Sequence, residues 1–156
     1  MWRLAEPDDD DAIVALCAAL YAEDPSPVAE APAHMAETLR ALRARPSRGR
    51  AVVCAPGAEV LGYALILPFW SNELGGPVSF IDELYVGPAG RGRGLGSALL
   101  NALSEGAFAD EPPVALMLEV TPDNHRAQAL YARLGFSGKN RAWRKQLRPA
   151  QPSSAS

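Results

Sequence analysis

Several features that would suggest a function at once are scarce in this sequence. It contains only two cysteines and two histidines among 156 residues. Cys17 and Cys54 stand far apart, with no CxxC pair and no metal-ligand spacing to His34 or His125, so we expect no metal site. We expect both cysteines to be small buried residues with free thiols, as in a reducing compartment.

A basic excess and a long apolar run are also missing. The formal net charge is -3 and the pI is near 5.4, whereas a nucleic-acid-binding domain normally carries a basic face. No apolar run approaches the roughly 20 residues of a membrane helix. The opening MWRLAEPDDDD is acidic where a secretory signal would be basic. We therefore expect a cytoplasmic protein that binds neither nucleic acid nor a membrane.

The sequence does contain an alternation of helical and extended patterns. Apolar residues at helical spacing predict helices at 8–24, 35–45, 95–106 and 121–136. Apolar runs bounded by turn residues predict strands at 2–7, 50–55, 59–70, 78–86, 114–120 and 142–147. This order predicts a mixed α/β fold, with a sheet covered by helices on both faces. We expect a single domain at 1–148 and a disordered tail at 149–156.

A loop rich in glycine and arginine separates the strand ending at Val86 from the helix beginning at Leu95. The backbone N–H groups of such a turn form a concave anion site, and the helix adds its own free N–H groups and the positive end of its dipole. Glycines at positions 92, 94 and 96 let a phosphate approach the backbone closely. Arg91 and Arg93 add positive charge. The loop therefore predicts a ligand that carries a diphosphate.

Three known phosphate-binding patterns can be compared with this loop. The P-loop pattern GxxxxGK[ST] is excluded because the loop contains no Gly-Lys pair. The dinucleotide pattern GxGxxG fits only in part, since Ser97 replaces its third glycine. Asp82 and Glu83 also interrupt a strand that a dinucleotide fold would keep almost wholly apolar. A nicotinamide oxidoreductase thus remains a third alternative. The pattern [RQ]-x-x-G-x-[GA] is met by Arg91, Gly94 and Gly96.

This last pattern gains its specificity from the segments around it. FIDELYV stands four residues before RGRGLGSALL, and LMLEV and then N-x-x-A-x-x-L-Y-x-x-L-G-F follow in order. From about Tyr63 to Phe136 the sequence resembles the GNAT superfamily of acetyl-CoA-dependent N-acetyltransferases. The element order agrees more weakly over almost the whole chain. The resemblance implies a mostly antiparallel central sheet, acetyl-CoA as the cofactor, and direct acetyl transfer to an amine in a ternary complex.

The resemblance also implies roles for individual residues. In the family the glycine loop binds the pyrophosphate of coenzyme A through main-chain N–H groups, and the preceding strand pairs with the pantetheine arm. The cofactor contacts implied here are Leu84, Tyr85, Val86, Arg91, Gly92, Arg93, Gly94, Leu95, Gly96, Ser97, Asn124 and Tyr131. The strand LMLEV would splay from its neighbour and leave a slot for the thioester.

Two of these residues also have a simpler structural interpretation. Tyr131 would protonate the departing thiolate, but it also falls on the apolar stripe of its helix and could belong to the core. Asn124 could be only an N-cap. Arg126 and Arg133 are either solvated or placed near the 3′-phosphate of the cofactor.

A proton acceptor is expected for chemical reasons. An amine with a pKa of about 10.4 is neutral at pH 7 only at a cost of about 4.6 kcal/mol, so a carboxylate should assist deprotonation. Asp82 and Glu83 are the carboxylates nearest the cofactor strand, and strict alternation would point them to opposite faces. Of the two, Glu83 is slightly favoured as this catalytic carboxylate; the alternative is that both acidic residues are solvated or cap a helix.

The acceptor site is the least defined part of the prediction. The resemblance places it between the first helices and the loop before the central strand. Its candidate residues are Tyr21, Glu23, Asp24, Phe69, Trp70, Asn72 and Glu73, with Pro25–Pro32 as a lid. Aromatic and acidic residues suit a cationic amine, and a polyamine, an aminoglycoside, an amino acid and a peptide N-terminus all stay open. The alternative to an enzyme is a non-catalytic acyl-CoA sensor, and a homodimer is the default assembly.

Overall fold

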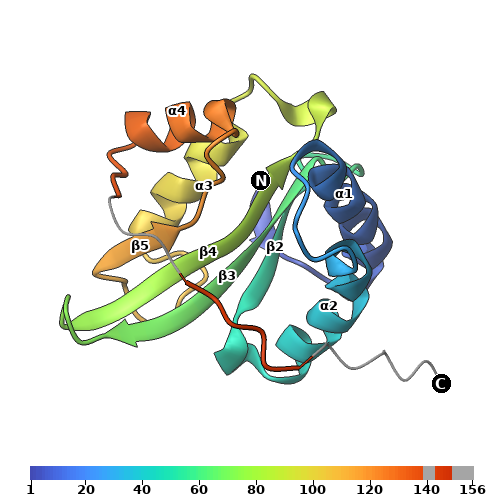
Figure 1. Ribbon diagram of the computed structural model, residues 1–156. Helices are drawn as coiled ribbons and strands as arrows, with labels where there is room; N and C mark the ends of the chain where they lie inside the picture. The colour runs from blue at the N-terminus through green and yellow to red at the C-terminus, as the bar shows by residue number, and fades with distance from the viewer. Residues whose placement is uncertain (139–142, 149–156) are drawn as a thin grey trace.

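The computed structural model describes residues 1–138 and 143–148. Its centre is a five-stranded sheet in the order β1-β2-β3-β4-β5 (Figure 1). The strands are β1 (Trp2–Leu4), β2 (Arg50–Cys54), β3 (Gly62–Ser71), β4 (Gly76–Val86) and β5 (Ala115–Leu118). Neighbours from β1 to β4 pair antiparallel, and β5 pairs parallel with β4. The predicted mixed fold with a mostly antiparallel sheet is confirmed.

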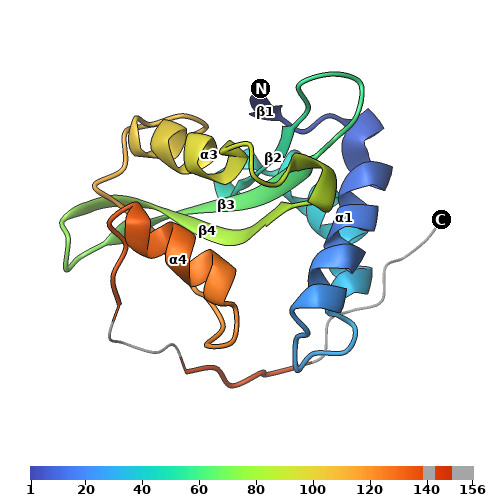
Figure 2. The same ribbon diagram turned by 90° about the horizontal axis from the view of Figure 1, so that it is seen from above.

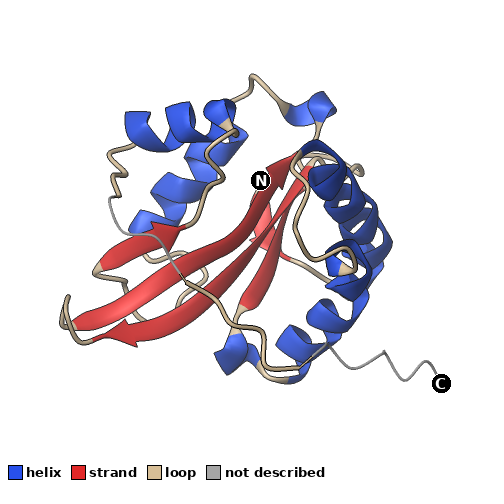
Figure 3. Cartoon of the chain, viewed as in Figure 1, coloured by secondary structure: helices blue, strands red, loops and turns tan. Residues whose placement is uncertain are grey.

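Helices cover both faces of this sheet, as Figures 2 and 3 show. One face carries α1 (Asp10–Glu23) and α2 (Met35–Ala44), and the other carries α3 (Leu95–Ser104) and α4 (His125–Arg133). Short 3-10 turns lie at Pro7–Asp9, Ala31–His34, Pro46–Arg48 and Pro88–Gly90. Among the described residues, no helix has both the length and the apolar character needed to cross a membrane.

The core lies on both faces of the sheet because side chains alternate along the central strands. Val53 and Leu65 pack toward α1 and α2, whereas their neighbours Val52 and Ala64 pack toward α3. Both cysteines are buried with free thiols, as the sequence predicted.

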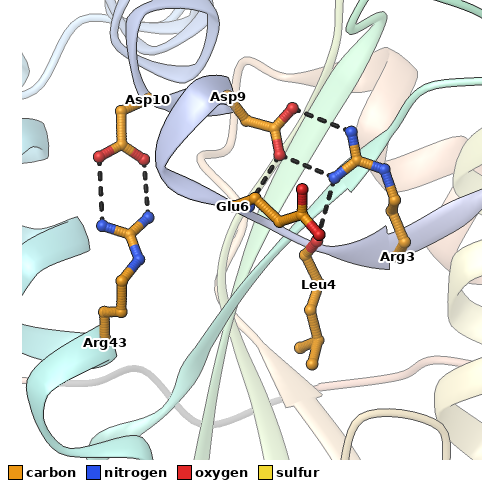
Figure 4. A network of polar contacts seen from close by, with 6 residues as sticks. All are labelled: Arg3, Leu4, Glu6, Asp9, Asp10 and Arg43. Atoms are coloured by element: carbon orange, nitrogen blue, oxygen red, sulfur yellow. Dashed lines mark hydrogen bonds and ion pairs between the residues drawn. The ribbon is translucent and has the colours of Figure 1, made fainter.

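Charged side chains fix the start of α1 against the rest of the fold (Figure 4). Arg3 of β1 donates two hydrogen bonds to the Asp9 carboxylate, at 2.7 and 2.9 Å. Arg43 of α2 forms a similar pair with Asp10, at 2.8 and 3.2 Å. Asp9 is buried, and its hydrogen bonds from Arg3 hold the pKa of its carboxyl below the ordinary value. Asp9 therefore stabilises the fold as a charged group.

The end of the chain departs from the prediction. The strand expected at 142–147 is absent from its described part, residues 143–147, and the Trp143 side chain is 98% exposed. That prediction was wrong because the segment pairs with no described strand, so its apolar side chains have no sheet to cover. The tail predicted at 149–156 lies outside the described residues.

Candidate functional site

The glycine loop is open toward solvent and leads directly into α3. Gly92 and Gly94 have φ of +72° and +70°, the left-handed region that favours glycine. A Cβ added at either position would meet no described atom within 4 Å. In the described part of the chain, no backbone hydrogen bond uses the N–H groups of residues 92–97. The loop therefore presents a row of free donors at the positive end of a helix.

Gly96 lines the same region and also lies close to α4. A Cβ at this position would lie 3.2 Å from Cδ2 of Leu130 on α4. A larger residue here would require the Leu130 side chain to shift, so the glycine favours close packing of α3 against α4. The start of α3 is also fixed from the other side, because the Trp2 indole N–H donates to the Leu95 carbonyl oxygen at 2.8 Å.

A slot opens beside the loop because β4 and β5 part. Their parallel pairing ends at Ile81 and Leu118, while β4 continues to Val86. A cavity of about 1180 Å³ occupies this region. Every predicted cofactor contact except Arg93 lines it. The end of β4, the glycine loop, the end of α1 and the start of α4 thus meet at one cavity.

Asn124 and Tyr131 both line this cavity from the side of α4. The Asn124 side chain accepts a hydrogen bond from the Ala127 N–H at 3.1 Å, so it is an N-cap as well as a lining residue. Tyr131 packs against Phe136, with ring centroids 5.7 Å apart. Its hydroxyl has no hydrogen bond to any described residue, and burial raises its pKa. The phenol is therefore protonated at neutral pH and faces a cavity.

Arg91, at the entry to the glycine loop, is held by three neighbouring groups. Its Nη2 donates to Glu23 at 2.7 Å, and its Nε donates to the Val86 carbonyl oxygen at 3.0 Å. The guanidinium lies 5.5 Å from the centre of the Tyr85 ring. The Tyr85 hydroxyl in turn donates to the other Glu23 oxygen at 2.8 Å. Hydrogen bonds from Tyr85 and then Arg91 lower the pKa of Glu23.

The pairing of β4 with β3 is irregular at the two predicted catalytic acids. Leu65 pairs with Glu83 and Ile66 pairs with Ile81, so Asp82 is an extra residue in β4. Ile81 and Leu84 pack into the same part of the core although they are three residues apart. Strict alternation, on which the sequence argument for opposite faces depended, therefore fails here.

Glu83 is held firmly by two tyrosines. Its two carboxylate oxygens accept hydrogen bonds from the Tyr21 and Tyr63 hydroxyls, each at 2.7 Å. Burial and the Glu83 charge raise the pKa of both hydroxyls, so they remain donors at neutral pH. Glu83 is thus a fixed negative charge on the α1 face of the sheet.

Asp82 differs from Glu83, since it makes no hydrogen bond or ion pair with the described residues. The Asp82 side chain is exposed, and its pKa is raised by neighbouring atoms that displace part of its hydration and further by the charges of Glu83 and Glu119. Glu119 directly follows β5 and was not among the predicted site residues. The acidic residue inside the otherwise apolar LMLEV was the available signal for it. The three acids place a negative region where the strands part.

The predicted acceptor residues fall into two separate groups. Tyr21, Glu23 and Asp24 lie at the end of α1, where Asp24 accepts a hydrogen bond from the Thr121 hydroxyl at 3.0 Å. The others, Phe69, Trp70, Asn72 and Glu73, lie at the β3–β4 hairpin and do not line the cavity. Because β4 has 11 residues, the hairpin lies about 33 Å from the glycine loop. The structure does not bring the two groups together.

Comparisons with known proteins agree with the geometry. Residues 14–136 match the family described as Acetyltransferase (GNAT) family. A mycothiol acetyltransferase of Frankia alni is 36% identical over 135 residues, which are 86% of this chain and 39% of that protein. This chain therefore spans well under half of that relative's length.

Solved structures share the fold at lower identity. A possible acetyltransferase from Clostridium difficile 630 has a TM-score of 0.77 and 22% identity, covering 96% of this chain and 98% of that chain. A predicted acetyltransferase with acetyl-CoA from Clostridium acetobutylicum has a TM-score of 0.73 and 16% identity, covering 94% and 96%. At these identities the likeness shows the fold alone.

Proposed function

Since this chain belongs to the acetyltransferase (GNAT) family, we propose that it transfers the acetyl group of acetyl-CoA directly to an amine in a ternary complex. One observation carries the proposal: free N–H groups at the start of α3 and an unpaired edge of β4 meet in a single cavity. A structurally similar acetyltransferase contains acetyl-CoA.

The described residues fit coenzyme A at two points. The space above Gly92 and Gly94, where no described atom lies within 4 Å of an added Cβ, suits a pyrophosphate that accepts the free N–H groups. The edge of β4 from Leu84 to Val86, which β5 leaves unpaired, suits an amide-containing arm that adds to it as a strand. When bound, acetyl-CoA supplies an acetyl thioester that an amine can attack.

Asp82 is our choice for the proton acceptor, in place of the slight preference for Glu83. Both Glu83 oxygens are engaged by tyrosine hydroxyls, whereas Asp82 has no described partner and a raised pKa. A carboxylate with a raised pKa is the stronger base. Glu83 then supplies a fixed charge that helps to raise the pKa of Asp82.

Tyr131 supplies the proton that the leaving sulfur requires. When a new carbon–nitrogen bond replaces the carbon–sulfur bond, Tyr131 would give its phenolic proton to the sulfur, Asp82 would take the proton of the amine, and Tyr131 would regain a proton from solvent. The raised pKa of Tyr131 ensures that this proton is present at neutral pH. A thiol with a pKa near 8.5 needs less help in leaving than an amine needs in losing its proton, so Tyr131 should matter less than Asp82.

A cationic amine is the acceptor class that these charges favour. Asp82, Glu83 and Glu119 leave the region where β4 and β5 part negative, and none of the three makes an ion pair with a described cation. A protonated amine is attracted to such a region and is then deprotonated within it.

Release of free thiol from acetyl-CoA, measured against a panel of amines, tests the proposal. The panel should include polyamines, aminoglycosides, amino acids and short peptides. We expect one cationic class to release thiol above the background without amine. If all amines stay at background while coenzyme A still raises the melting temperature, a non-catalytic acyl-CoA sensor becomes the better explanation.

A further inference from the structure

We propose that Glu23 is a positioning residue that holds the glycine loop in its binding shape through Arg91. In this view the Arg91 side chain acts on the loop and is not a ligand of the phosphates. The inference rests on the proposed function, because it concerns the same cofactor site. It also moves Glu23 from the acceptor side, where the sequence placed it, to the cofactor side.

The contacts around Arg91 form a closed ring at the entry to the loop. Arg91 donates to Glu23 at 2.7 Å, Tyr85 donates to Glu23 at 2.8 Å, and the guanidinium stacks 5.5 Å from the Tyr85 ring centre. The bond from Arg91 Nε to the Val86 carbonyl oxygen, at 3.0 Å, ties the ring to the end of β4. A planar guanidinium that both stacks and donates in this way is held in one orientation.

A glycine loop needs such support. Gly92 and Gly94 have no described atom packed near their Cβ positions, and glycine has more backbone freedom to lose than any other residue. The loop is instead fixed at its two ends. The ion pair of Arg91 with Glu23 holds the N-terminal end of the loop. The 2.8 Å hydrogen bond from the Trp2 indole N–H to the Leu95 carbonyl oxygen holds the C-terminal end. Holding the free N–H groups in place beforehand lowers the entropy lost on binding.

Asp24 provides a matched control, because it neighbours Glu23 and also lines the cavity. Its carboxylate accepts from the Thr121 hydroxyl at 3.0 Å and makes no ion pair with a described cation. Removing either negative charge should strengthen binding of an anion by simple electrostatics. If Glu23 positions the loop, E23Q should instead weaken binding. The two variants are therefore expected to change affinity in opposite directions.

The experiment measures the dissociation constant of coenzyme A by calorimetry for the wild type, E23Q, D24N, R91Q and the double variant E23Q/R91Q. We expect E23Q to weaken binding about fivefold, the size of one charge-assisted hydrogen bond at a partly exposed site. D24N should bind at least as tightly as the wild type. The double variant should be no weaker than R91Q alone, because both substitutions break one contact.

Two further readouts separate positioning from general instability. E23Q should raise the KM for acetyl-CoA far more than it changes kcat at saturation. Backbone NMR order parameters at residues 92–97 should be lower in ligand-free E23Q than in D24N, while the two melting temperatures stay close. A lower melting temperature without lower order parameters in the loop would overturn the inference.

The proposed function and this inference fail in different ways. If the wild type does not bind coenzyme A, both the proposed function and this inference are wrong. A wild type that binds, together with an E23Q variant that binds equally well or more tightly, removes only the inference. That result would mean that Glu23 competes with the pyrophosphate for Arg91.

Discussion

The two ends of β4 lie on the same strand and pair with the same neighbour, β3, yet they differ in almost every other respect. At the glycine-loop end, Glu83 and Tyr85 are part of hydrogen-bond networks, and the strand borders a large cavity. At the hairpin end, Phe69, Trp70 and Leu74 are exposed, and Trp70 is 66% exposed. Of these two ends, the glycine-loop end carries the described networks of side-chain hydrogen bonds.

The difference arises from two local features of the sheet. The bulge at Asp82 interrupts the alternation of side chains, and the pairing with β5 ends at Ile81. Beyond this point β4 has one paired edge and one free edge. Substitutions on the glycine-loop side of Ile81 should therefore affect binding and turnover, whereas those at the hairpin should affect neither.

The largest effect is expected at Gly94. G94E would place a side chain at φ +70° and a negative charge where the pyrophosphate is proposed to bind. We expect the affinity for coenzyme A to fall by about 100-fold or more, as measured by calorimetry. The control is G57E, which adds the same charge in the turn between β2 and β3, where a Cβ also meets no described atom within 4 Å. Normal binding by G94E would show that the pyrophosphate lies elsewhere.

The next largest effect is expected at Asp82. D82N should lower kcat by about 100-fold, the usual contribution of a general base. In the wild type, kcat/KM should fall as the pH drops through a pKa above the ordinary 3.8 of aspartate, and D82N should lose this dependence.

The stability of D82N should not fall with its kcat. A raised pKa means that the folded state binds the proton more tightly than the unfolded chain, so the charged form destabilises the protein at neutral pH. D82N should therefore melt at an equal or higher temperature. D9N is the opposite case: the pKa of Asp9 is lowered, its charge stabilises the fold above the unfolded pKa, and its loss should lower the melting temperature. A D82N variant that loses stability as D9N does would identify Asp82 as a structural acid.

A smaller effect is expected at Tyr131. Y131F keeps the ring contact with Phe136 but removes the proposed acid. We expect kcat to fall by about tenfold, because a thiolate leaves with little help, while the affinity for coenzyme A stays near that of the wild type. Unchanged turnover with acetyl-CoA would reduce Tyr131 to a residue of the core.

The smallest effect is expected at Trp70. W70A should change the KM for acetyl-CoA and for the amine by less than about twofold, as is usual for exposed positions away from a site. Steady-state kinetics with the active amine would measure both constants. A large rise in the KM for the amine would mean that the acceptor reaches the hairpin end of β4. Trp70 would then be an acceptor-binding residue, as the sequence predicted.

The sequence predicted the order of the elements as far as α4 and the open glycine loop, and the predicted cofactor contacts other than Arg93 line the cavity. Those features depend on local patterns, such as apolar spacing and glycine positions. Contacts between distant segments could not be predicted in this way. Nothing in the sequence pairs Glu23 with Arg91, since their meeting depends on where α1 ends above β4.

Two further departures from the sequence prediction also depend on how strands pair. Counting residues along β4 assumed strict alternation, and one extra residue at Asp82 broke it. The apolar and basic pattern after residue 142 is suitable for a strand, but a strand also needs a partner, and residues 143–147 have none among the described strands. The periodicity of apolar residues predicts which face of a strand a side chain lies on. It does not predict whether a partner strand is present.

The free edge of β4 has a consequence for the protein in the cell and in the laboratory. An unpaired strand edge is a template on which another chain can add, and this is a common route to aggregation. A ligand that covers the edge would protect the chain and stabilise it by mass action, by about 2.7 kcal/mol at one hundred times its dissociation constant. If coenzyme A is that ligand, as proposed, purification should give a better yield of folded protein when coenzyme A is present throughout.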